Sequence, residues 1–141
     1  MSMEPRPNRS ALRSVAAVLA GLVVIVVLSI GTDMALHATG VYPPLGEPMN
    51  DTFLLLLATA YRSAYAVAGS YLAARIATDR PMGHALALGV VGLALGIAGA
   101  VSTRDAGPAW YPIALIVIAM PCAWAGGRLH GVRAPKSIAL E

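Results

Sequence analysis

The stretch "SVAAVLAGLVVIVVLSIG", from Ser14 to Gly31, contains no charged residue, and it decides the class of fold. A helix rises 1.5 Å per residue, so this stretch and its apolar flanks reach the roughly 30 Å thickness of a hydrocarbon core. A membrane-spanning β-strand would show about 10 residues of alternating polarity, and this alternation is not present. The stretch therefore predicts a transmembrane helix.

Three further apolar blocks follow, separated by linkers that contain proline, glycine and polar residues. The mean hydropathy is +0.70, and only 12% of the residues are charged, against about 25% in a soluble domain. We expect an all-α membrane protein, a bundle of four transmembrane helices at about residues 11–38, 52–77, 82–101 and 109–129. This transmembrane domain, residues 11–130, is predicted to lie between a disordered cytoplasmic N-terminus, residues 1–10, and a cytoplasmic tail, residues 131–141.

The first apolar block follows several arginines, as the apolar core of a secretory signal peptide does. A cleavable signal has an apolar core of about 7–15 residues and a small-residue cleavage site. Here the core is longer, and "ALHA", Ala35 to Ala38, matches such a site poorly. We therefore interpret the block as an uncleaved first helix.

Basic residues lie mainly on one side of the four predicted helices, where eight are found: Arg6, Arg9, Arg13, Arg75, Arg80, Arg128, Arg133 and Lys136. The opposite side has Arg104 alone, together with Glu47, Asp51 and Asp105, and the tenth basic residue, Arg62, lies within an apolar block. The positive-inside rule places both termini in the cytoplasm. We expect a multi-pass protein of a bacterial plasma (inner) membrane, with the lipid bilayer as its partner. The basic residues form no patch, so we expect no nucleic-acid partner.

Sequence motifs for catalysis or cofactor binding are missing. The chain has no phosphate-binding loop, dinucleotide fingerprint, zinc-protease motif or nucleophile elbow. Its single cysteine, Cys122, lies in an apolar block and suggests neither a disulfide nor a metal site. We expect no catalytic residue, no metal and no cofactor.

Arg62 is costly within an apolar helix unless it is paired. Its Cα is expected roughly 16 Å below the outer boundary, and its long side chain points outward. Asp33, the only acid within an apolar block, is expected roughly 7 Å below that boundary with its side chain pointing inward. The sequence therefore predicts a buried Asp33–Arg62 pair in the outer half of the membrane.

Other polar residues share helix faces with this pair. Ser29, Asp33 and His37 are spaced four apart, and Tyr61, Arg62 and Tyr65 lie close together on the second helix. Two interpretations stay open. The group is either a structural clasp between two helices or a small polar cavity for an ion, a proton or a small ligand. The candidate site is Ser29, Asp33, His37, Tyr61, Arg62 and Tyr65.

The third block carries glycines on one helix face, with spacings of three, four and three: Gly89, Gly92, Gly96 and Gly99. Small residues let helix backbones approach closely in lipid. We expect this face to pack on alanines of the second block (Ala60, Ala64, Ala68) or on Ala125 and Gly126 of the fourth. The alternative is a homodimer, or contact with another membrane protein.

For function, we expect a non-enzymatic membrane component. A small oligomeric transporter or channel for an ion or small solute is one alternative, although polar residues occupy only the outer half. A membrane enzyme or redox subunit, using His37 or the pair His84 and His130, is another. The aromatic residues Tyr42, Trp110 and Tyr111 are assigned to the membrane interface.

Overall fold

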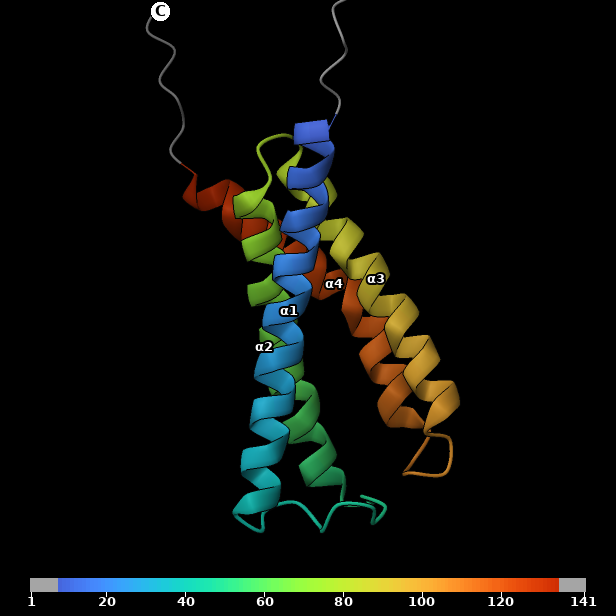
Figure 1. Ribbon diagram of the computed structural model, residues 1–141. Helices are drawn as coiled ribbons and strands as arrows, with labels where there is room; N and C mark the ends of the chain where they lie inside the picture. The colour runs from blue at the N-terminus through green and yellow to red at the C-terminus, as the bar shows by residue number, and fades with distance from the viewer. Residues whose placement is uncertain (1–7, 135–141) are drawn as a thin grey trace, which may run out of the picture.

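The computed structural model describes residues 8–134, and this part of the chain contains four α-helices and no strand (Figure 1). The helices are α1 (Asn8–Ala38), α2 (Thr52–Ile76), α3 (Pro81–Ser102) and α4 (Trp110–Arg133). α1 begins within the segment that was predicted to be disordered, and α4 continues past the predicted end at residue 129. Residues 1–7 and 135–141, where the rest of the disordered N-terminus and the cytoplasmic tail were predicted, lie outside the described residues.

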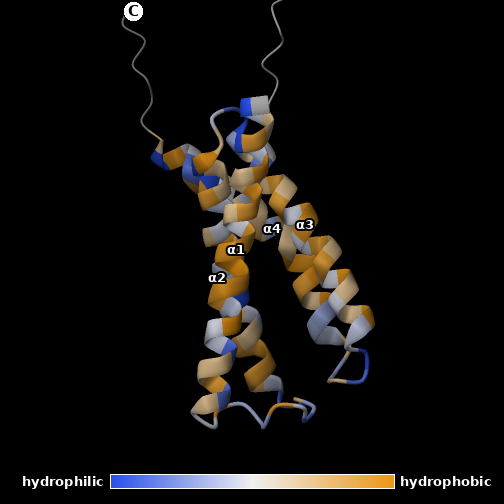
Figure 2. Ribbon diagram, in the orientation of Figure 1, coloured by the Kyte–Doolittle hydropathy of each residue, from blue (hydrophilic) through white to orange (hydrophobic). Residues whose placement is uncertain are grey.

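Three of these helices, α1, α3 and α4, are long and apolar enough to cross a membrane. α2 is also long, with 25 residues, but its tyrosines and the two arginines Arg62 and Arg75 make it more polar. Figure 2 shows that apolar residues cover the middle of the helices, whereas hydrophilic residues gather in the loops and at the helix ends. Residues 8–134 are thus all-helical and include three helices of membrane-spanning character.

Local signals fix the helix ends. The Asp51 carboxylate caps α2, since its Oδ1 accepts hydrogen bonds from the backbone N–H groups of Phe53 (2.8 Å) and Leu54 (3.2 Å), which have no partner within the helix. α3 begins at Pro81. Proline lacks a backbone N–H, but the N–H of the first helical residue has no partner within the helix, so no helical hydrogen bond is lost. The preceding Arg80 has a left-handed backbone, with φ of 49°, so the chain turns sharply between α2 and α3.

The helices form two antiparallel pairs, α1 with α2 and α3 with α4 (Figure 1). α2 packs along both α1 and α4, whereas α1 meets α3 over a short length and makes no contact with α4. The pairs converge at the end where α1 begins and α4 ends, and they diverge toward the α1–α2 and α3–α4 loops. The packed core therefore lies toward the converging end.

Small residues permit this convergence. A Cβ added to Gly21 of α1 would lie 2.5 Å from the carbonyl oxygen of Gly69 in α2, so these backbones touch. Gly126 of α4 approaches the carbonyl oxygen of Val67 in α2 equally closely. Close backbone approach increases van der Waals contact between helices. Several alanines of the four helices are almost fully buried: Ala17, Ala58, Ala73, Ala74, Ala85 and Ala123.

The predicted glycine face of α3 divides into two parts. Cβ atoms added to Gly89 and Gly96 would lie 2.6 Å from the Ala123 side chain and 3.1 Å from the Ile116 side chain, both of α4. Gly92 and Gly99 meet nothing within 4 Å. A face that spans these four glycines is wider than the strip of α3 that touches α4, so only half of it is in contact.

The residues that contact that face differ from those predicted. Ala60, Ala64 and Ala68 of α2 are exposed rather than packed on α3. Gly126 and its neighbour Ala125 were expected to meet α3, but Gly126 lies against α2. The fourth block was one of the two predicted partners, and Gly89 and Gly96 meet α4 through Ala123 and Ile116.

Candidate functional site

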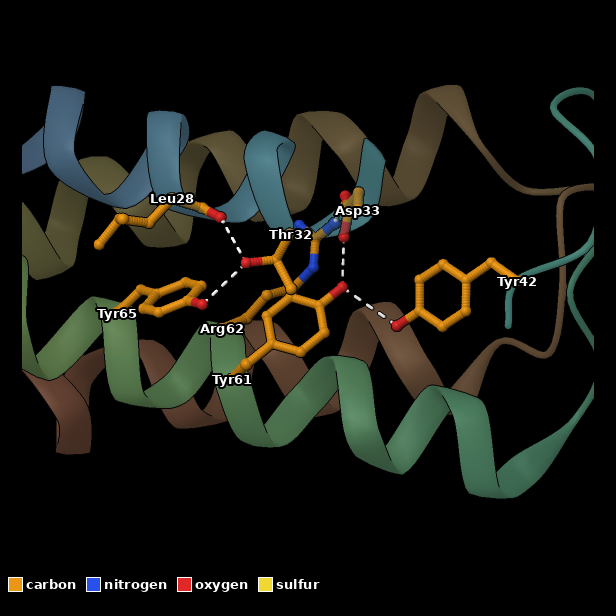
Figure 3. Close-up of polar contacts among 7 residues, drawn as sticks. All are labelled: Leu28, Thr32, Asp33, Tyr42, Tyr61, Arg62 and Tyr65. Atoms are coloured by element: carbon orange, nitrogen blue, oxygen red, sulfur yellow. Dashed lines mark hydrogen bonds and ion pairs between the residues drawn. The ribbon is translucent and has the colours of Figure 1, made fainter. Parts of the chain in front are cut away.

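An ion pair joins α1 to α2 in the diverging half of the molecule (Figure 3). The Arg62 Nη2 atom lies 2.5 Å from Asp33 Oδ2. The expected burial of this pair is not found, because the Arg62 and Asp33 side chains remain 34% and 22% exposed. The physical reason is the divergence of the helix pairs, which leaves this part of α1 and α2 only partly covered by α3 and α4.

Two tyrosines extend a chain of hydrogen bonds from the Asp33 carboxylate (Figure 3). The Tyr61 hydroxyl donates a hydrogen bond to Asp33 Oδ1. Because this uses its only proton, it accepts the hydrogen bond from the Tyr42 hydroxyl, at 3.1 Å. Tyr42 is only 5% exposed. The α1–α2 loop therefore turns back and carries Tyr42 into the site, whereas the sequence had suggested a place in the aromatic belt.

His37 supports the site without contacting the ion pair. Its Nδ1 lies 2.7 Å from the Pro43 carbonyl oxygen. Its ring packs edge-to-face on Tyr42, with centroids 5.4 Å apart, a favourable aromatic geometry. His37 therefore holds the loop that positions Tyr42.

Tyr65 bonds to Thr32 rather than to the ion pair (Figure 3). The Thr32 hydroxyl donates to the Leu28 carbonyl oxygen at 2.8 Å, so Tyr65 donates to Thr32, also at 2.8 Å. This makes a second polar link between α1 and α2. Thr32 was missed in the sequence because a threonine in a helix commonly bonds its own preceding turn, and its second partner depends on the facing helix.

A cleft of about 870 Å³ lies between the two helix pairs. Its walls are mainly apolar and come from all four helices, with Gly92, Gly96 and Gly99 along the α3 side. At the loop end, Gly107 packs against the Met49 carbonyl. The polar side chains that line the cleft are Ser29, Asp33, Arg62, Ser63, Ser70, Thr103, Arg104 and Tyr111.

Two features of this lining were not predicted. Tyr111 was assigned to the membrane interface, but it faces the cleft together with Arg62. Ser63 and Ser70 extend the polar lining along α2 away from the loops. Ser29, a predicted site residue, is 6% exposed and lies in the cleft wall one helical turn from Asp33. Nothing in the sequence specifies which face of α4 meets α2, so the approach of Tyr111 could not be foreseen.

The chemistry available in the cleft is binding by charge and hydrogen bonds. Arg62 Nε is buried and has no hydrogen-bond partner. Among the described residues, it is the one buried side-chain nitrogen or oxygen atom without such a partner. Residues 8–134 hold no group of three His, Cys, Asp or Glu side chains arranged for a metal. His84 bonds to the Arg80 carbonyl, and His130 packs on Tyr71, so neither is engaged with the other in this structure.

Comparison with known proteins gives no assignment. No protein-family model, curated protein or solved structure matches this chain.

Proposed function

We propose that this chain is a non-enzymatic, four-span protein of a bacterial plasma membrane, with both termini in the cytoplasm, and that its outer cleft binds a small amphipathic molecule from the bilayer. The observation that carries this proposal is the cleft of about 870 Å³, mainly apolar, with the Asp33–Arg62 pair in its wall. Ligand pockets commonly have volumes of about 300–1,000 Å³, apolar walls and a few polar groups.

The path of the chain supports α2 as the fourth span. Arg13 Nε, near the start of α1, donates a hydrogen bond to the carbonyl oxygen of Ile76, the last residue of α2, at 3.2 Å. The end of α2 therefore lies beside the start of α1. If α1 crosses the bilayer, α2 must cross it in the opposite direction to return there.

Charge supports the orientation. Among the described residues, the converging end carries Arg9, Arg13, Arg75, Arg80, Arg128 and Arg133 and one acid, Asp79. The diverging end has Arg104 with Glu47, Asp51 and Asp105. The excess of arginine favours a cytoplasmic converging end. The cleft then belongs to the outer half of the membrane. Arg6 and Lys136 lie outside the described residues.

The shape of the cleft favours a ligand that arrives from lipid. α1 has no contact with α4 and little with α3, so the cleft is open between α1 and α3 on the side that faces the bilayer. The converging half is filled by glycine and alanine contacts. This packing favours a binding site that is closed at its inner end over a continuous channel through one chain.

A matched pair of glycine variants tests the proposal. Gly92 lines the cleft and Gly131 of α4 does not, and a Cβ at either position meets nothing within 4 Å. Gly92→Leu should fill part of the cleft without forcing helices apart, and Gly131→Leu is its control. Native mass spectrometry of the purified chain in neutral detergent measures retention of added hexadecanol or hexadecyl phosphate, tested separately.

We expect wild type and Gly131→Leu to retain at least one of these amphiphiles. Gly92→Leu should retain it about tenfold less, because a Leu side chain displaces about two ligand methylenes, each worth about 0.8 kcal/mol. Equal retention by Gly92→Leu and Gly131→Leu would remove the cleft as the binding site.

A further inference from the structure

The hydrogen bonds around Asp33 leave Arg62 with spare binding capacity. Both carboxylate oxygens of Asp33 are engaged, one by Tyr61 and the other by Arg62. The guanidinium, which has five N–H donors, gives one of them to Asp33 through Nη2. Its Nε–H is buried and has no partner among the described residues. A buried donor of this kind is costly unless an acceptor reaches it.

The charge of the cleft lining points to the kind of acceptor. The ionised side chains in the lining are Arg62, Arg104 and Asp33, which gives two positive charges and one negative. Arg104 lies in the loop after α3, and Tyr111, at the start of α4, brings a hydroxyl to the same region. In surroundings of low dielectric, an excess positive charge attracts an anion more strongly than it does in water.

The size of the cleft limits the rest of the ligand. At about 30 Å³ for each water-sized group in a liquid, the cleft holds on the order of 30 non-hydrogen atoms, enough for one hydrocarbon chain and its headgroup but not for a two-chain phospholipid. The apolar wall available to this chain includes side chains of α1 and α3, such as Leu22, Ile25 and Leu95.

We infer that the occupant is a single-chain anionic amphiphile of the outer leaflet, with its acid group at Arg62 and Arg104 and its chain between α1 and α3. This inference rests on the proposed function, because it names the class of ligand for the same cleft. Arg62 then binds two acids at once, Asp33 through Nη2 and the ligand through the guanidinium donors that face the cleft. Charge-assisted hydrogen bonds from an arginine suit a carboxylate or phosphate oxygen.

Competition between two ligands with the same chain tests the headgroup. Equimolar hexadecyl phosphate and hexadecanol are added to the purified full chain in neutral detergent, and native mass spectrometry measures the ratio of the two complexes. We expect hexadecyl phosphate to be preferred by about tenfold or more, the effect of one charge-assisted hydrogen bond. Arg104→Gln should lower this preference several-fold. Arg128→Gln is the control, because Arg128 lies over the Trp124 ring and not in the cleft lining.

The outcomes separate this inference from the proposed function. If both amphiphiles bind equally and Gly92→Leu excludes both, the cleft binds amphiphiles but the acid specificity is wrong. If Arg128→Gln lowers the preference as much as Arg104→Gln, the preference reflects net charge, and the site at Arg62 and Arg104 is wrong. If neither amphiphile binds, the proposed function fails and the inference fails with it.

Discussion

The Asp33–Arg62 pair offers the most quantitative prediction. The perturbation is a double-mutant cycle of Asp33→Asn, Arg62→Gln and the two together. Breaking a fully buried pair costs about 3–5 kcal/mol, whereas an exposed pair contributes about 0–1 kcal/mol. Since the Arg62 and Asp33 side chains are 34% and 22% exposed, we expect an intermediate cost of about 2 kcal/mol for either single variant.

The double variant should recover much of this loss, because no uncompensated charge is left. The two introduced amides would still be polar groups in a partly buried place, so we expect the double variant to lose about 1–2 kcal/mol and the coupling energy to be on the order of 2–3 kcal/mol. Reversible unfolding of the purified chain in mixed micelles, titrated with a denaturing detergent, measures each free energy. Tyr65→Phe is a control, because this hydroxyl bonds to Thr32 and not to the pair.

Additive losses in the cycle would refute the reasoning. They would mean that Asp33 and Arg62 stabilise the protein independently, and that the 2.5 Å contact contributes no coupling energy.

Two further predictions concern packing and topology. Gly69→Leu should strongly destabilise the chain, because a Cβ there would lie 2.5 Å from the Ile25 side chain and 2.7 Å from a backbone oxygen of α1. Gly31→Leu is the control and should be tolerated, because a Cβ at Gly31 meets nothing within 4 Å. Equal midpoints of the two variants in unfolding titrations would exclude a close helix crossing at Gly69. On a Cys122→Ala background, Asn50→Cys should react with a membrane-impermeant thiol reagent added outside, and Thr78→Cys should react only when the reagent is added on the cytoplasmic side. Labelling of both cysteines from one side would contradict α2 as a membrane span.

The sequence predicted the helices well because long apolar blocks bounded by proline, glycine and charged residues leave few alternatives in a membrane. The meeting of Asp33 and Arg62 also followed from simple geometry, since depth along two antiparallel helices depends only on residue number. The extent of burial did not follow. It depends on how far α3 and α4 diverge from α1 and α2, and depth along a helix carries no information about this.

The rest of the site depends on contacts between distant segments. Tyr42 enters through the folding of a proline-rich loop, and Tyr111 through the face that α4 presents to the cleft. Neither contact has a local signature in the sequence. The same limit applies to the glycines of α3. Gly89 touches α4 and Gly92 faces open space, although both belong to the same regularly spaced set of glycines.

The most direct test of the central claim is to locate the ligand on the protein by solution NMR. The isotope-labelled chain in deuterated detergent is mixed with protonated hexadecyl phosphate, and intermolecular NOEs from the chain methylenes are recorded. We predict NOEs to the amide protons of Gly92 and Gly96, which line the cleft, and none to Gly131. NOEs spread equally over the exposed apolar face of α1, at Val23 and Val27, with none in the cleft, would contradict this prediction.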